Sequence, residues 1–358
     1  MTRGTKALIS ASALKNNYQR VQELAPNSKI WAVIKADAYG HGSVNVAKVL
    51  SGADGYAVAT LGEARTLRAA GIQAPILLLA GVTEAGHFSE AAEKGLECIV
   101  HCYEQLDFLD SFDCKATLKV WLKVDTGMHR LGFMPADLPE VVSRLAQYAH
   151  VEIVGMMTHM CCADELNRPE ITERQLKAIS RCALEGKQIT MANSASVIKW
   201  PETHADWVRP GIMLYGATPF ADMTAKQIGL AAAMTLVAPV IAIKRLAEGE
   251  SVGYGMRWTA RRDSVIATLA IGYADGYPRH APDGTPVWLN GKTVPISGRV
   301  CMDMLMVDVT ELTDVKVGDL AELWGANLPV DEVGRYVDTI GYELITRVSP
   351  RVEREMID

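Results

Sequence analysis

The sequence predicts an α/β protein built from a (β/α)8, TIM-type barrel and a second, mostly β domain. Eight short apolar runs alternate with helix-like segments through the first two-thirds of the chain. The runs are nearly continuous in their apolar character, which is typical of parallel strands covered on both faces. After about residue 225 the rhythm changes to β-rich runs separated by turn signals. We therefore expect a barrel over residues 1–225 and a β-rich domain over residues 226–358.

The segment before the first barrel strand predicts an amphipathic helix. Leu14, Tyr18, Val21 and Leu24 recur at helical spacing, and Ser10 stands where a helix cap would. The apolar run in this segment is too short and too interrupted for a signal peptide. We therefore expect a cytoplasmic protein.

The barrel prediction depends on eight units of strand and helix in roughly 200 residues, which fit a closed barrel better than an open sheet. No GxGxxG motif follows any of the strands, which argues against a dinucleotide-binding fold. The strand candidates are IWAVIK (30–35), YAVAT (56–60), PILLLAG (75–81), LECIVH (96–101), LKVWLKV (118–124), VEIVGMMTH (151–159), QITMAN (188–193) and WVRPGIMLYG (207–216). The helix candidates between them are 44–50, 61–71, 86–95, 103–112, 138–149 and 173–186.

The second domain is predicted from five β-rich runs, of which one contains the hairpin signal Asn290-Gly291. One late helix is expected near DEVGRYV. The runs are 234–246, 264–273, 285–296, 305–310 and 319–325.

Composition excludes several classes of protein. The 358 residues carry a net charge of −6 without a Lys/Arg run, which argues against nucleic-acid binding. No apolar stretch reaches the roughly 20 residues of a membrane span. The seven cysteines include no CxxC pair, and no set of His or Cys has ligand spacing, so we expect free thiols and no metal site.

Polar residues at the ends of the strand candidates define the candidate site, because barrels of this kind place their active sites at the carboxyl ends of the strands. The set contains no pair of carboxylates, which argues against glycoside-type acid/base chemistry. It consists of Lys35 with Tyr39, the stretch 125–130, His159, Asn193-Ser194, and Arg209 with Gly211.

These groups suit an anionic ligand that carries a carbonyl. A partly desolvated lysine has a lowered amine pKa and can form a Schiff base. Ser194 and the backbone near Gly211 could hold a phosphate. A phosphorylated ring with an aldehyde is pyridoxal 5′-phosphate, and Lys35 would be its anchor.

Eight motifs occur in the order found in one enzyme family, and together they span nearly the whole chain. The chain resembles the alanine racemases, pyridoxal-phosphate enzymes of fold type III. The motifs are IKADAYGHG (34–42), KVDTGMHRLG (123–132), NSAS (193–196), DWVRPGIMLYG (206–216), VGYG (252–255), GYADGYPR (272–279), CMDM (301–304) and GYELITR (341–347).

The resemblance implies two catalytic bases. Lys35 would act on one face of the substrate α-carbon, and Tyr254, supplied by the second subunit of a homodimer, on the other. His159 would hydrogen-bond Arg209, or sit beside Tyr254 and tune its phenol. Arg209 would face the pyridine nitrogen. Arg130 would position the phenolic oxygen of the cofactor and the substrate carboxylate.

The resemblance also implies a phosphate site and a substrate pocket. Lys123 matches a position that the family often carries carbamylated, where it orients Arg130. The phosphate would be bound by Tyr39, Ser194, Gly211, Ile212 and Tyr342. The partner chain would line the substrate pocket with Met302, Asp303 and Tyr273.

The predicted function is interconversion of L-alanine and D-alanine, either for peptidoglycan supply or for D-alanine catabolism. A related racemase of broader specificity is the alternative, since Met256 and the pair Cys161–Cys162 depart from the family pattern. An amino-acid decarboxylase of related architecture is disfavoured by Arg209. A pyridoxal-phosphate carrier is disfavoured by the second domain, because such proteins are generally a lone barrel.

Overall fold

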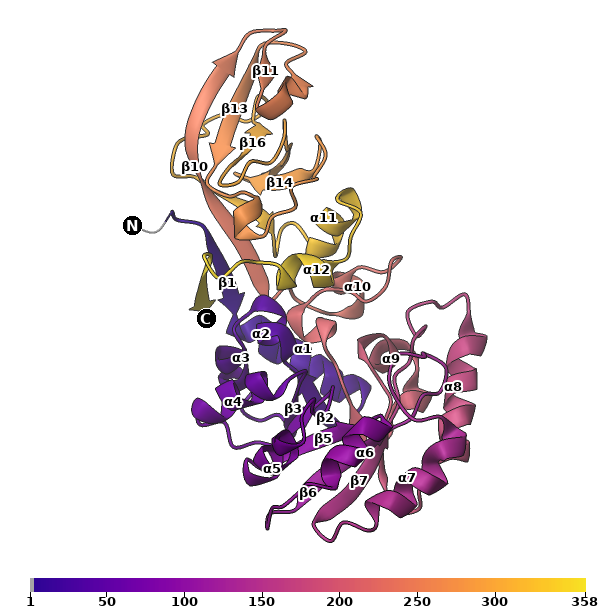
Figure 1. Cartoon of the computed structure of the whole chain (residues 1–358). Coiled ribbons are helices and arrows are strands. Elements are labelled where there is room, and N and C mark those ends of the chain that lie inside the picture. Colours follow the sequence, from indigo (N-terminus) through magenta and orange to yellow (C-terminus); the bar gives the residue numbers. More distant parts are fainter. Residues whose placement is uncertain (1–2) are drawn as a thin grey trace.

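The computed structural model describes residues 3–358 and contains a closed parallel barrel with a separate, mostly β domain (Figure 1). The predicted fold class is confirmed. Each of the eight predicted apolar runs overlaps one barrel strand, although the last run is extended only at Trp207–Val208, and Ile30 pairs with Val208 to close the ring. The strands, in order around the barrel, are β2 (Lys29–Val33), β3 (Gly55–Val58), β4 (Ile76–Leu78), β5 (Leu96–Val100), β6 (Leu118–Lys123), β7 (Val151–Met157), β8 (Gln188–Thr190) and β9 (Trp207–Val208).

The helices of the barrel include all six that the sequence predicts between strands. α8 begins at Pro169 rather than Glu173, because proline fits the first turn of a helix. These six are α3 (Ser43–Val49), α4 (Leu61–Ala69), α5 (Gly86–Glu93), α6 (Tyr103–Leu109), α7 (Leu138–Leu145) and α8 (Pro169–Arg181). Shorter elements that were not predicted are α2 (Lys35–Gly40), η1 (Pro135–Asp137), α9 (Ser194–Lys199), η2 (Pro201–Thr203), η3 (Ile212–Tyr215) and α10 (Ala225–Ile228).

The predicted first helix is α1 (Ala11–Leu24), and its cap is the one expected. The Ser10 hydroxyl accepts a hydrogen bond of 3.0 Å from the Ala13 N–H, and Leu14, Tyr18 and Val21 are buried. Within residues 3–358, none of the helices combines the length and apolar character that crossing a bilayer requires.

The sheet of the second domain is organised around one long strand, β10 (Met234–Leu246), which pairs with β1, β13 and β17. β1 (Lys6–Ser10) was not predicted, and it joins this sheet although its sequence precedes the barrel. β1 also pairs in parallel with the last strand, β18 (Glu353–Ile357), so the two ends of the chain lie side by side (Figure 1). The division at residues 225 and 226 stays a prediction.

The other predicted strands of this domain form as expected. Asn290 and Gly291 both adopt positive φ, 45° and 84°, in the turn between β14 and β15, as a tight hairpin requires. The late helix is α11 (Val330–Tyr336). The remaining elements are β11 (Ser251–Val252), η4 (Tyr254–Met256), β12 (Trp258–Thr259), β13 (Ser264–Leu269), η5 (Tyr273–Asp275), β14 (Pro286–Leu289), β15 (Lys292–Pro295), β16 (Leu305–Asp308), β17 (Leu320–Trp324) and α12 (Gly341–Thr346).

Three tryptophans pack together in the barrel interior. The rings of Trp31 and Trp207 stack with centroids 4.2 Å apart, and Trp121 meets Trp31 edge-on. Glycines make room for them: a Cβ added at Gly55 would lie 2.2 Å from the Trp31 ring, and one at Gly155 would lie 2.4 Å from Trp121. This dense packing gives the strand ends a rigid base.

Candidate active site

The candidate site is a cavity of about 490 Å³ at the carboxyl ends of the barrel strands. Lys35 follows β2, Lys123 ends β6, His159 follows β7 and Arg209 follows β9. All four line the cavity, so chemistry-bearing side chains from separate strands meet at one place.

The structure divides the predicted site residues into two groups. The group that lines the cavity is Lys35, Tyr39, Arg130, His159, Ser194, Arg209, Gly211, Ile212 and Tyr342. The others are not part of this cavity: Tyr254, Tyr273, Met302 and Asp303. These four belong to the second domain, and β11, which precedes Tyr254, lies at the end of that domain far from the barrel (Figure 1).

The cavity is strongly cationic. Lys35, Lys123, Arg130 and Arg209 line it, and no carboxylate of the described chain does. Burial, and then Arg130, lower the pKa of Lys35. Burial likewise lowers the pKa of Lys123 to about 7 and that of Arg209 to about 9. Such a cavity attracts anions, and the Lys123 amine is partly neutral near pH 7.

Arg209 is held in place by acceptors on neighbouring strand ends. Its Nη1 donates to Thr190 Oγ1 at 2.7 Å, and its Nη2 donates to the carbonyls of Thr158 at 2.8 Å and Met191 at 3.1 Å. Its Nε–H has no acceptor among residues 3–358. Thr158 and Thr190 were not among the predicted site residues, although Thr158 follows β7 and Thr190 ends β8, so the strand-end rule could have found them.

His159 is a hydrogen-bond acceptor for Arg209. Its Nδ1 lies 3.3 Å from Arg209 Nη2, which is the first of the two arrangements left open by the sequence. Burial and the neighbouring Arg209 hold the pKa of His159 well below its usual value. This imidazole is therefore neutral near pH 7.

The turn that carries Lys35 is left-handed. Ala36, Asp37, Ala38 and Tyr39 have φ between 51° and 54°, a region that costs non-glycine residues roughly 1–2 kcal/mol each. Strain of this kind persists only where the surroundings enforce it, and it is concentrated at functional sites. Nothing in the residue types of this segment signals the left-handed conformation.

Several contacts hold this turn. The Asp37 carboxylate accepts the Ser43 N–H at 2.7 Å, and Arg354 Nε donates to the Gly40 carbonyl at 3.1 Å. Helix α12 packs directly on it, since a Cβ at Gly40 would lie 2.3 Å from the carbonyl oxygen of Ile345. The barrel and the C-terminal segment therefore hold the turn together.

A small cradle of hydroxyl and backbone N–H groups lies where the chain leaves β8 and β9. Ser194 Oγ accepts hydrogen bonds from the backbone N–H groups of Gly211 at 2.9 Å and Met213 at 3.4 Å. The Tyr39 hydroxyl approaches so closely that a Cβ at Gly211 would lie 2.5 Å from it. Hydroxyls and backbone amides that converge in this way suit a phosphate.

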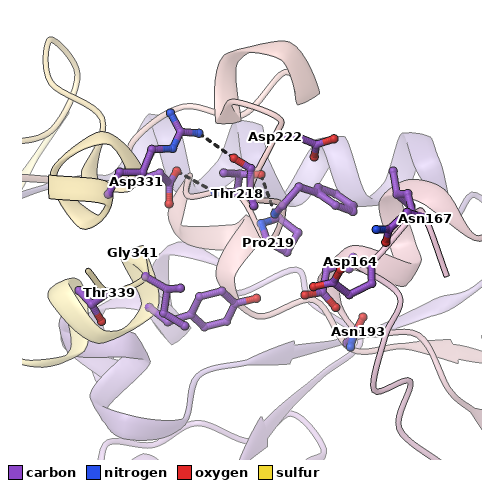
Figure 2. Close-up of a pocket in the computed structure, with 17 residues that line it drawn as sticks. Asp164, Asn167, Asn193, Thr218, Pro219, Asp222, Asp331, Thr339 and Gly341 are labelled. Atoms are coloured by element: carbon purple, nitrogen blue, oxygen red, sulfur yellow. Dashed lines mark hydrogen bonds between the residues drawn. The ribbon is translucent and has the colours of Figure 1, made fainter. Parts of the chain in front are cut away.

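A larger cavity of about 940 Å³ shares the lining residues Asn193 and Tyr342 with the first one. Figure 2 draws the residues that line this larger cavity. Its lining is acidic where the inner cavity is cationic. Figure 2 shows Asp331, from the C-terminal segment, facing Thr218, whose N–H donates to it at 3.0 Å. Burial raises the pKa of Asp331. The acidic lining residues are Asp164, Glu165, Asp222 and Asp331.

Fold and cavity together define a barrel protein with two lysines and two arginines gathered in one cavity at the carboxyl ends of its strands. Comparison with known proteins identifies the family. Residues 9–219 match the model of the alanine racemase N-terminal domain, and residues 233–356 match that of the C-terminal domain. The chain belongs to the alanine racemase family, a family of isomerases.

Individual relatives match along their whole length. The alanine racemase of Vibrio parahaemolyticus is 47% identical, with 99% of each chain covered, and that of Nitrosococcus oceani is 48% identical over 98% of this chain and 99% of its own. The crystal structure of the biosynthetic alanine racemase from Pseudomonas aeruginosa has a TM-score of 0.96 at 46% identity, with both chains fully covered. The family resemblance expected from the sequence is confirmed.

Proposed function

We propose that the chain interconverts L-alanine and D-alanine with pyridoxal 5′-phosphate held in the Lys35 cavity. The observation that carries the proposal is one site in which the half-buried amine of Lys35, whose pKa is lowered, two arginines and a hydroxyl-lined cradle converge without a carboxylate of the described chain. The names of the full-length relatives support the same reaction. Matches over both domains favour the racemase over the decarboxylase and the lone-barrel carrier.

The residues present fit this cofactor. Lys35 would hold its carbonyl carbon, and the Ser194–Gly211 cradle would hold its phosphate, together with Tyr39, Ile212 and Tyr342. When bound, pyridoxal phosphate supplies an electron-withdrawing ring that acidifies the α-proton of an attached amino acid. The Arg209 Nε–H, which has no acceptor within the described chain, is available to the ring nitrogen.

Arg209 would influence how much charge the ring nitrogen of bound pyridoxal phosphate receives. Even with a pKa lowered to about 9, its guanidinium stays protonated near neutral pH. It would therefore donate a hydrogen bond to that nitrogen without giving up a proton. We expect this to disfavour decarboxylation and transamination, which need a stronger electron sink.

Racemisation needs a proton removed on one face of the α-carbon and a proton returned on the other. Lys35 would serve one face and Tyr254 the other. A phenol has an ordinary pKa near ~10, so cations beside it must lower that value. Arg209 and Arg130 supply such charge in this cavity. Arg130 makes no hydrogen bond within residues 3–358, so its guanidinium is free for a substrate carboxylate.

Tyr254 would come from the second subunit of a homodimer. Its side chain is 72% exposed, as is that of Met256, and Met302 is 52% exposed. Tyr254 and Met304 line one apolar groove. Exposed apolar groups that gather on one face favour association, here with a second copy of this chain. Tyr273 and Asp303 would enter the partner's site with them.

The decisive experiment is polarimetry. Loss of optical rotation from L-alanine by the chain with added pyridoxal phosphate is expected, and an unchanged rotation would refute the proposal. Lys35→Ala should abolish both the activity and the visible absorbance of the covalently bound cofactor. Retention of both would mean that the anchor is another residue.

The two-base arrangement has its own test. Tyr254→Phe should stop racemisation while one enantiomer still exchanges its α-proton with solvent deuterium, because Lys35 remains. Equal, modest losses of exchange from both enantiomers would contradict two bases. Sedimentation of the wild-type chain should show a dimer.

A racemase of broader specificity is the alternative. Met256 is exposed near Tyr254, and the Sγ atoms of Cys161 and Cys162 lie 3.7 Å apart two residues beyond His159. Comparison of kcat/KM for alanine with that for serine and lysine separates the two. All seven cysteines are free, which supports a reducing, cytoplasmic location. There the reaction would supply D-alanine to peptidoglycan or consume it in catabolism.

A further inference from the structure

The carboxylate of Glu63 contacts the turn that carries Lys35. Glu63 lies in the first turn of α4, and its Oε1 accepts the Ala36 N–H at 2.7 Å. Ala36 N belongs to the peptide that directly follows Lys35. The contact therefore fixes the orientation of the peptide plane from which the Lys35 side chain extends.

The other oxygen of Glu63 is also occupied. Its Oε2 accepts the Ala59 N–H at 2.7 Å and the Thr60 N–H at 3.1 Å. Thr60 Oγ1 in turn accepts the Glu63 N–H at 3.3 Å, which completes a capping box. A capping box needs only the two reciprocal bonds between Glu63 and Thr60. The bond to Ala36 joins elements 27 residues apart and serves no helix end.

The bond between Glu63 and Ala36 matters because Ala36 begins the left-handed turn. Four consecutive strained residues follow Lys35, and an unsupported chain would relax toward right-handed geometry. The Asp37–Ser43 and Gly40–Arg354 bonds hold the far part of the turn. At its near end, beside Lys35, the side-chain acceptor is Glu63. Its charge also opposes the lowering of the pKa of Lys35 by burial and by Arg130.

We propose that Glu63 is a positioning residue for Lys35, and that its carboxylate holds the left-handed turn so that the amine stays aimed into the cavity. The proposal deepens the function proposed above and rests on Lys35 being the cofactor anchor and one of the bases. A base displaced by about 1 Å can lose on the order of a hundredfold in rate. Glu63 acts through Lys35, since it is not among the residues that line the cavity.

The chain offers a matched control. Thr60→Ala removes the other half of the capping box and leaves the Glu63–Ala36 bond intact. Glu63→Ala removes the carboxylate, and Glu63→Gln preserves its size. The single carbonyl oxygen of the glutamine can accept a hydrogen bond either from the Ala36 N–H or from the N–H groups of residues 59 and 60. Its NH2 group then faces the remaining N–H and cannot accept from it. Glu63→Gln also keeps the test valid should Glu63→Ala fail to fold.

Two readouts are needed, and the first uses the chain without cofactor. Hydrogen–deuterium exchange of a peptide covering residues 34–40 should accelerate by about tenfold in the Glu63 variants and by less than about twofold in Thr60→Ala. The second is steady-state racemisation of alanine. The Glu63 variants should lose about tenfold or more in kcat with KM changed less than about twofold, and Thr60→Ala should keep both.

Glu63 variants that match Thr60→Ala in either readout would overturn the inference. Fast exchange with a normal kcat would show that the turn does not aim the base. A low kcat with normal exchange would show that Glu63 acts elsewhere. Failure of the proposed function looks different: the wild-type chain would not racemise alanine, while the exchange measurement would still decide whether Glu63 holds the turn.

Discussion

The guanidinium of Arg209 donates a hydrogen bond to Nδ1 of His159 across 3.3 Å. An Nδ1 that accepts carries no proton, so the neutral ring holds its proton on Nε2. Burial and Arg209 keep the folded-state pKa well below 6.5. As pH falls through about 6.5, the unfolded chain therefore binds a proton that the folded chain refuses. His159 therefore lowers the free energy of unfolding below about pH 6.5 and does not change its pH dependence above that value.

We expect His159→Asn to flatten the fall in stability between pH 6.5 and 5, by up to about 1.4 kcal/mol per pH unit. Urea unfolding of the apo chain at several pH values measures this. His150 is exposed, and His150→Asn serves as the control substitution. A wild-type slope identical to that of His159→Asn would mean that His159 titrates normally.

Lys123 is buried and forms no ion pair with a carboxylate within residues 3–358, and burial lowers its pKa from 10.5 to about 7. Below pH 7 the Lys123 amine is protonated in both the folded and the unfolded chain, and the folded chain bears the full free-energy cost of the buried charge. Between pH 7 and 10.5 only the unfolded chain keeps the proton, so stability rises with pH. Lys123→Met should be more stable than wild type below pH 7, by a few kcal/mol at most, and the difference should vanish toward pH 10.5.

A neutral Lys123 amine can also react with carbon dioxide. We expect ¹³C-bicarbonate to give one carbamate carbon signal in the wild-type chain and none in Lys123→Met. The carbamate would carry a negative charge between Arg130 and Arg209, so bicarbonate should raise the melting temperature of the wild type only. Equal effects on both chains would place the modification elsewhere.

Sequence reasoning succeeded where a residue's place follows from the strand pattern. Lys35, His159 and Arg209 each follow an apolar run, and parallel strands in a closed barrel bring such ends together. Tyr254 carries no such signal, because it lies in a short turn of a β domain and only the family motif singles it out.

Other features were beyond prediction for physical reasons. The left-handed turn uses Ala, Asp and Tyr, which favour right-handed geometry, and only tertiary contacts impose it. The first strand was missed because KALIS reads as part of the following helical pattern, and its partners lie more than two hundred residues away. Glu63 was not among the predicted site residues, because its contact with Ala36 joins segments 27 residues apart.

Gly211 is expected to be intolerant of any side chain. Its φ is −117°, which any residue can adopt, so the obstacle is space alone: the Tyr39 hydroxyl would lie 2.5 Å from an added Cβ. Gly211→Ala should weaken pyridoxal-phosphate binding by about tenfold or more and destabilise the fold by roughly 1–3 kcal/mol. Tyr39→Phe removes the clashing oxygen, so the double variant should bind better than additivity predicts. Strictly additive losses would rule out this contact as the cause.

Asp275 connects the two loops that carry Tyr273 and Met302. It is 2% exposed, pairs with Arg3 at 3.1 Å and Arg351 at 3.0 Å, and accepts the Gly272 N–H at 2.8 Å. Two backbone hydrogen bonds beside it join the loops: the Tyr273 N–H donates to the carbonyl of Cys301, and the Ala274 N–H donates to the carbonyl of Met302, at 3.0 Å each. One buried carboxylate therefore sets the position of both loops.

Asp275→Asn keeps the shape but puts an amide where an acceptor is needed. We expect a loss of about 1–3 kcal/mol in the free energy of unfolding and a KM for alanine that rises more than kcat falls, because the loops that would line the partner's pocket loosen. Melting curves and steady-state kinetics measure the two effects. Glu311→Gln breaks the exposed pair with Arg262 in the same domain and serves as the control, which should change neither quantity. An Asp275→Asn chain that melts earlier with KM intact would limit Asp275 to holding the domain together.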